Sequence, residues 1–146
     1  MTPPRLTRPV PADPLATFSI RPEMAGIYRI DGQDLPALKA AASDLGQAVF
    51  TVDLCHARNI PGFLKAMKRD LHFPDGFGNN LDALNDCLTD FSWHPAAGYV
   101  IILAHSEALQ ATPSSLATLN EVLAFAAESW KNRDIPFRIF YLHGQP

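Results

Sequence analysis

Long apolar runs are missing from this sequence, and cysteine is scarce. Within its 146 residues no apolar stretch approaches the roughly 20 residues that a membrane-spanning helix needs. Residues 1–5 also lack the apolar stretch of a signal peptide, so we expect a cytoplasmic protein that does not contact a membrane. Its two cysteines, Cys55 and Cys87, are not spaced as C-x-x-C. This spacing favours reduced, buried side chains over a disulfide or a metal site.

The residue patterns that enzymes require are absent as well. The five histidines are scattered, and none forms an H-x-x-x-H pair or a spacing typical of an acid-paired base. Paired aspartates could serve glycoside hydrolysis or Mg²⁺ binding, but acids on a single helix face do not form the opposite walls of a cleft. We therefore expect a protein that is not an enzyme, with no catalytic residues, no metal and no other cofactor.

Positive charge is missing from one long segment of the chain. Residues 70–130 hold eight acidic residues and no Lys or Arg, although the whole chain has 12 basic and 15 acidic residues. A segment whose charges are all negative attracts positively charged partners, so the expected partner is basic. Direct nucleic-acid binding is disfavoured, because phosphate contacts require a stripe of Lys and Arg. The alternative is a solvated acidic face that only improves solubility, and charge alone does not decide between the two.

The remaining composition indicates one folded domain. Apolar residues make up 47% of the chain and charged residues 18%, which is typical of a globular protein. Six prolines fall within residues 1–24, which we interpret as a loosely ordered extension. From residue 25 to residue 146 strands alternate with helices, which predicts an α/β domain with a mainly parallel sheet of three to four strands. The predicted strands are 26–30, 48–54, 98–104 and 137–142, and the predicted helices are 35–45, 61–71, 80–91 and 114–131.

The predicted helix at residues 80–91 has two chemically different faces. At about 100° per residue, Leu84 and Leu88 lie on an apolar side. Asp82, Asp86 and Asp90 lie on the other side at i, i+4 and i+8. Like charges at this spacing destabilise a helix by about 0.2–0.5 kcal/mol per pair, so helix stability does not explain why the three aspartates are present. Either Asn79 or Asn80 can cap the helix, and we expect Phe77 in the preceding loop to enter the core.

Residues 73–89 strongly resemble the signature of the barstar family, the inhibitors of barnase-type ribonucleases. The pattern G-x-N-L-D-A-L-x-D-C-L-T is intact from Gly78 to Thr89. The order of strands and helices over residues 48–142 is also similar to that of the family. Residues 25–47 add a strand and a helix that lie outside the part of the chain resembling the family.

The resemblance implies a single barstar-like domain that acts as an intracellular ribonuclease inhibitor, an immunity protein or antitoxin. Asp82 and Asp86 would stand in for RNA phosphates and pair with the Arg, Lys and His of a basic ribonuclease. Gly76 and Asn85 depart from the family prototype, which has an aromatic residue and Trp there, and these departures favour a target nuclease different from barnase. A monomer is favoured, and a generic acidic interaction module with a non-nuclease basic partner is the alternative. The expected partner-binding residues are Gly76, Gly78, Asn80, Asp82, Asn85, Asp86, Asp90 and, from the late helix, Glu128.

Overall fold

A four-stranded parallel sheet forms the centre of the molecule. In the computed structural model, residues 26–144 are described, and the predicted Pro-rich extension lies outside these residues. The strand order is β1-β4-β3-β2, and every neighbouring pair is parallel, which confirms the predicted α/β class. The strands are β1 (Gly26–Asp31), β2 (Ala48–Asp53), β3 (Tyr99–Ala104) and β4 (Phe137–His143).

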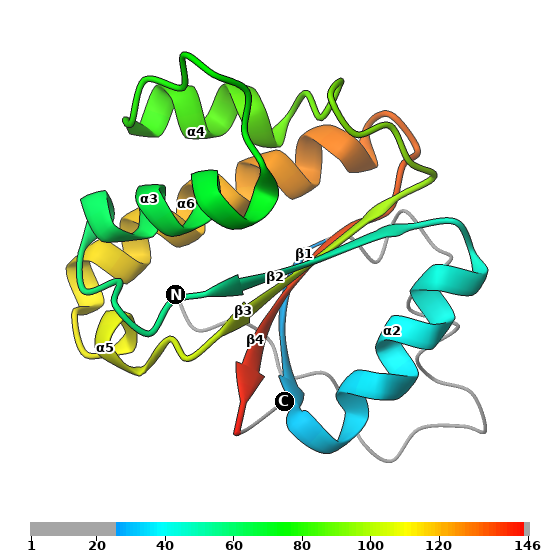
Figure 1. Ribbon diagram of the computed structural model, residues 1–146, viewed down its shortest axis with the longest axis horizontal. Helices are drawn as coiled ribbons and strands as arrows, with labels where there is room; N and C mark the ends of the chain where they lie inside the picture. The colour runs from blue at the N-terminus through cyan, green and yellow to red at the C-terminus, as the bar shows by residue number, and fades with distance from the viewer. Residues whose placement is uncertain (1–25, 145–146) are drawn as a thin grey trace.

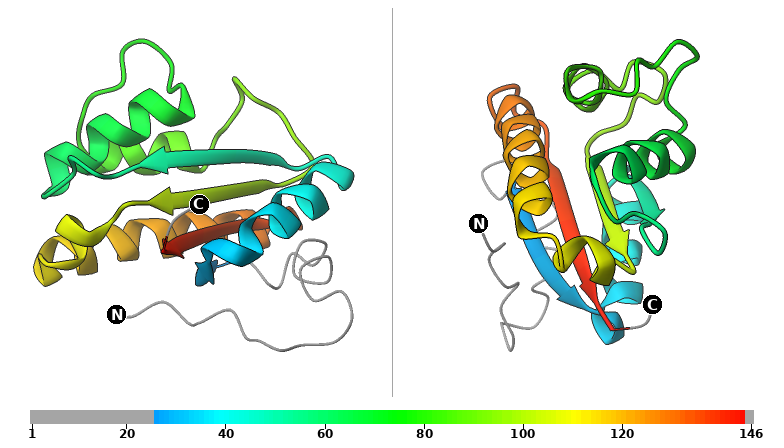
Figure 2. Two further views of the ribbon diagram at one scale, coloured as in Figure 1. Left: turned by 60° about the horizontal axis from the view of Figure 1, so that its bottom comes forward. Right: turned by 90° about the vertical axis from the view of Figure 1, so that its left-hand side faces the viewer.

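Helices cover both faces of this sheet. Helix α2 packs on one face, and α3, α4 and α6 lie on the other (Figures 1 and 2). The chain crosses from one edge strand to the other through α2 and then returns strand by strand over the opposite face. The helices are α2 (Leu35–Asp44), α3 (Ile60–Leu71), α4 (Leu81–Leu88), α5 (Glu107–Gln110) and α6 (Pro113–Lys131), with a short 3₁₀ turn, η2 (Gly32–Asp34), before α2.

The central strands are buried because both faces are covered. All six residues of β3 are buried, as its continuous apolar sequence predicts. The larger apolar cluster lies under α3, α4 and α6, and a smaller one lies under α2. Within residues 26–144, no helix combines the length and the apolar character that crossing a bilayer requires.

One charged side chain is buried inside the sheet layer. Arg138 of β4 is fully buried, and its Nη2 donates a hydrogen bond to Oε1 of Gln47 at 2.7 Å. Burial lowers the pKa of Arg138 to about 10, so its guanidinium is still charged at neutral pH. Because Gln47 immediately precedes β2, this bond ties the start of one edge strand to a central strand.

The cysteines differ from the sequence prediction in one respect. Both thiols are free, but Cys55 is exposed and Cys87 is only partly buried, so the prediction of two buried side chains is wrong. Cys55 follows the end of β2, where its backbone N–H donates to Oδ1 of Asp53 at 3.0 Å. This turn leaves the sheet, and the residue therefore has no neighbouring strand to cover it.

Candidate protein-interaction surface

The start of α4 is set by a side-chain cap. Oδ1 of Asn80 accepts a hydrogen bond from the backbone N–H of Ala83 at 2.8 Å, so Asn80 is the cap and Asn79 is not. The Asn80 amide also donates to the carbonyl of Gly78 at 3.3 Å. A Cβ added at Gly78 would lie 3.2 Å from Nδ2 of Asn80. These two predicted partner-binding residues therefore position the helix, whatever they contact in a complex.

Replacement of the cap should destabilise the protein measurably. We expect Asn80→Ala to lower the free energy of unfolding by about 1 kcal/mol, because one N–H of the first turn loses its acceptor. Urea denaturation followed by circular dichroism measures this change. Asn80→Ser is the matched control, since a serine hydroxyl also caps well. Equal losses in the two variants would contradict a capping role.

Helix α4 buries one face and exposes its aspartates on the other. Leu84 and Leu88 are fully buried, whereas Asp82 and Asp86 are exposed. Within residues 26–144 no salt bridge engages either aspartate. Among the residues that the structure describes, the helix thus presents two carboxylates that form no ion pair.

Asp90 is exposed, but it lies just after α4 and not within it, because the predicted helix at residues 80–91 is longer than the observed one. The helix ends at Leu88, and Asp90 lies in the following turn, where it accepts a hydrogen bond from the Ser92 hydroxyl at 2.9 Å. The next residue, Phe91, adopts a left-handed φ of 50° and buries its ring 4.4 Å from that of Tyr99. Packing of Phe91 therefore takes the chain out of the helix and leaves Asp90 as an exposed acid beyond its end.

The end of α4 is fixed by side chains from the end of α6. Nε1 of Trp130 donates to the carbonyl of Leu88 at 2.7 Å, and Nη2 of Arg133 donates to that of Thr89 at 2.6 Å. Carbonyls at a helix end lack partners within the helix, so these donors satisfy them. The positive guanidinium also suits the negative end of the helix dipole. No sequence pattern near Trp130 indicates its contact with Leu88, because the two residues are 42 positions apart.

The remaining predicted residues surround α4 in different ways. Gly76 is exposed with a φ of +90°, a conformation that favours glycine, and no atom lies within 4 Å of an added Cβ. Asn85 is half-buried, and its Oδ1 is buried without a hydrogen-bond partner. Glu128 is exposed on α6. Phe77 is buried as predicted, with its ring 4.9 Å from that of Phe73.

The thiol beside the aspartates is poorly suited to catalysis. Burial raises the pKa of Cys87, and the negative charges of Asp86 and Asp90 raise it further. A thiol with a raised pKa stays protonated at neutral pH and is a weak nucleophile. Cys87 therefore serves as a packing residue behind the exposed aspartates.

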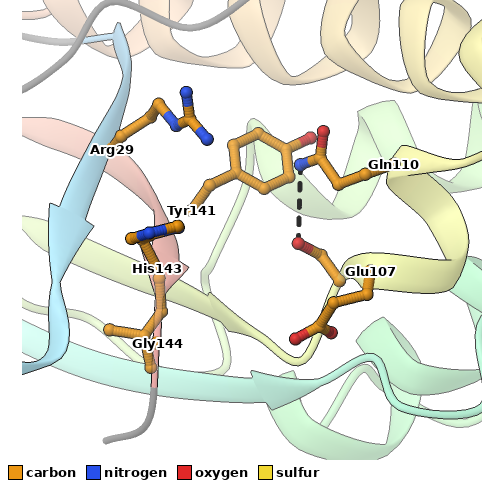
Figure 3. A pocket seen from close by; sticks show the side chains of 8 residues that line it. Arg29, Glu107, Gln110, Tyr141, His143 and Gly144 are labelled. Atoms are coloured by element: carbon orange, nitrogen blue, oxygen red, sulfur yellow. Dashed lines mark hydrogen bonds between the residues drawn. The ribbon is translucent and has the colours of Figure 1, made fainter.

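A cavity lies apart from α4, at the carboxyl ends of three strands. It has a volume of about 360 Å³, and Figure 3 shows Arg29, Glu107 and His143 among its lining residues. Nε2 of Gln110 donates to the Ser106 hydroxyl at 3.4 Å, but no hydrogen bond joins His143 to Glu107. In the part of the chain that the structure describes, no group of three His, Cys, Asp or Glu side chains could hold a metal ion.

Together, the sheet and α4 define a small parallel α/β domain that presents an acidic helix. The family model for Barstar (barnase inhibitor) matches residues 47–142. The chain belongs to this family, whose members are inhibitors, and the predicted resemblance is confirmed. Strand β1 and helix α2 precede the matched residues.

The other comparisons are informative only about the fold. One similar solved structure is the Aeropyrum pernix ORC2 protein in ADPNP-ADP complexes, with a TM-score of 0.58 and 16% sequence identity. The match covers 90% of this chain and 39% of that chain, so this chain spans about two fifths of the ORC2 length. A comparison with curated proteins finds no match.

Proposed function

We propose that this protein inhibits a basic ribonuclease by placing α4 against the cations that bind RNA phosphates. The observation that carries this proposal is the pair of exposed aspartates, Asp82 and Asp86, without a neutralising base on an anchored helix. Family membership supports the coarser role of a barnase-type inhibitor that binds a ribonuclease. In this proposal the protein is a cytoplasmic, monomeric immunity protein or antitoxin and needs no cofactor.

The geometry of α4 suits recognition of cations. Residues four apart on a helix are neighbours, with about 5–6 Å between their Cβ atoms, so Asp82 and Asp86 act from one surface patch. A carboxylate can accept two parallel hydrogen bonds from one guanidinium, which gives geometric specificity as well as energy. Because Asn80 caps the start of α4 and Trp130 holds its end, binding costs little ordering entropy.

The charge distribution also supports a basic partner. The absence of Lys and Arg from residues 70–130 leaves the acidic residues around α4 unopposed along the chain. Such a field accelerates association with a cationic protein, and dissolved salt screens it. The proposal therefore requires an association rate that falls steeply as ionic strength rises.

Inhibition assays test the proposal directly. We expect the purified chain to block RNA cleavage by barnase or another small basic ribonuclease at a one-to-one ratio. The association rate should fall between about 0.01 M and about 1 M salt, as the Debye length shrinks from about 30 to about 3 Å. Asp44→Asn, which removes an exposed acid from α2 on the opposite face, should inhibit like the wild type. Lack of inhibition of every such ribonuclease at low salt would contradict the proposal.

A second candidate function is that of an acidic module that binds a basic protein other than a nuclease. Gly76 and Asn85 favour it, because neither provides the apolar area that aromatic residues would give beside the aspartates. Asn85 also carries a buried amide oxygen without a partner, which is costly and contributes no apolar contact. Binding to basic proteins without inhibition of any ribonuclease would support this candidate.

A further inference from the structure

Helix α6 exposes a large aromatic side chain. Phe125 is 60% exposed, and the other exposed large apolar side chain in residues 26–144 is Leu45, at 38%. The core is lined by other residues of α6, and Phe125 is not one of them: the buried ones are Leu119, Asn120, Leu123, Ala126, Ala127 and Trp130. Single exposed apolar residues are common on protein surfaces, so exposure alone does not indicate a binding role for Phe125. Its position relative to α4 does bear on that role.

The position of Phe125 follows from the contacts of the next helical turn. Ser129 lies four residues later and therefore on the same stripe of α6. Its hydroxyl accepts a hydrogen bond from Nη2 of Arg133 at 3.0 Å, and the same Nη2 donates to the carbonyl of Thr89, the residue that follows α4. The stripe that holds Phe125 and Ser129 is thus the side of α6 that lies toward α4.

The two helices extend alongside each other from this contact. Both run toward the same end of the molecule, and their ends meet where Trp130 and Arg133 bind the last carbonyls of α4 (Figure 1). Phe125 lies between one and two helical turns before this meeting point, on the side of α6 that lies toward α4. Figure 2 shows the same two helices as neighbours when the molecule is turned.

The surroundings of Phe125 are acidic. Glu121 and Glu128 lie four residues before and three residues after it, and both are exposed. The nearby cation, Arg133, is held by contacts within the protein: its guanidinium carbon lies 3.8 Å from the centre of the Trp130 ring, and its Nη2 donates to the Thr89 carbonyl. We refer to Glu121, Phe125 and Glu128 as the acidic–aromatic patch of α6. It combines one apolar group with two negative charges, which complements an apolar pocket bordered by Lys and Arg.

We propose that Phe125 anchors the bound ribonuclease by filling such a pocket next to the cations that pair with Asp82 and Asp86. This inference rests on the proposed function and adds Phe125 to an interface in which Glu128 was the only residue expected from α6. Aromatic side chains are enriched at protein interfaces, and a few such anchors carry most of the binding energy. A cationic rim also favours contact with the ring face. Phe125 thereby supplies the apolar contact that Gly76 and Asn85 do not.

Charge and apolar contact should affect different rate constants. Acidic residues at the rim mainly accelerate encounter, whereas a buried anchor mainly slows dissociation. We expect Phe125→Ala to raise the dissociation rate by at least about tenfold and to leave the association rate within about twofold. Because Phe125 is exposed, its loss should leave the melting temperature and the circular dichroism spectrum unchanged.

Surface plasmon resonance with the ribonuclease that the wild type inhibits tests this inference. Leu45→Ala is the matched control, since it removes the other exposed large apolar side chain from the end of α2 on the opposite face. Phe125→Trp should dissociate as slowly as the wild type. An unchanged dissociation rate in Phe125→Ala, together with loss of binding in Asp86→Asn, would overturn the anchor but leave the proposed function standing. Failure of the wild type to bind any basic ribonuclease would overturn both.

Discussion

Asp86→Ala should weaken binding to the ribonuclease by about 30- to 5,000-fold. The substitution leaves a cation of the partner buried without its counter-charge, which costs about 2–5 kcal/mol. The barnase–barstar complex is one of the examples behind this range of energies, so the expected loss is the family's value and not an independent derivation. Asp86 is exposed in the free protein, so its removal should not lower the melting temperature. Isothermal titration calorimetry measures the affinity, and differential scanning calorimetry verifies that the fold is retained.

The three aspartates provide an internal comparison. Asp82→Ala should also weaken binding strongly, because Asp82 shares the exposed face of α4 with Asp86. Asp90→Ala should have a smaller effect, since Asp90 lies beyond the helix end and already accepts a hydrogen bond from Ser92. Equal losses in the Asp86 and Asp90 variants would contradict a helix-centred interface and would indicate a response to net charge alone.

The exposed face of α4 could be predicted because it depends on residues close together in the sequence. Leu84 and Leu88 are four residues apart, and so are Asp82 and Asp86, so helical spacing alone separates the two sets. The position of the helix N-terminus was predictable to within one residue for the same reason, because its cap is Asn80. The parallel sheet was also predictable, because strands alternate with helices along the chain.

The end of α4 could not be predicted, because it depends on residues that are distant in the chain. Helical spacing places Phe91 on the apolar stripe of a longer helix, which would put Asp90 on the exposed face. In the structure the Phe91 ring packs against Tyr99, and the backbone leaves the helix to reach it. Trp130 reaches α4 from 42 residues away in sequence, and no local pattern indicates that contact.

The short helix α5 and the contribution of Phe125 were missed for related reasons. A helix of four residues has too few apolar positions to show a period. Phe125 follows the helical pattern of α6, and a Phe in such a pattern is normally interpreted as a core residue. Only the observed packing shows that Trp130 and its neighbours fill the core and leave Phe125 outside.

Trp130→Ala should destabilise the protein by about 3–5 kcal/mol, the largest loss of stability that we expect from a single substitution. The side chain is 4% exposed, stacks on Phe137 with 5° between the ring planes, and supports the guanidinium of Arg133. Its removal leaves a large cavity between α6 and the sheet. For a protein of this size the melting temperature should fall by about 2–4 °C per kcal/mol. A loss below about 1 kcal/mol would show that the surrounding aromatic residues fill the space.

Trp130→Phe separates the anchoring of α4 from the packing of the core. It retains an aromatic ring but removes the N–H that binds the Leu88 carbonyl, which should cost about 1–3 kcal/mol. Trp93→Phe is the matched control, because Nε1 of Trp93 donates to the carbonyl of Leu71 at the end of α3, at 3.2 Å. Both variants lose one indole hydrogen bond to a helix end, but only Trp130→Phe releases α4. We therefore expect both to unfold at lower urea concentration and only Trp130→Phe to bind the ribonuclease more weakly. Equal weakening of binding in the two variants would mean that affinity follows overall stability and not the position of α4.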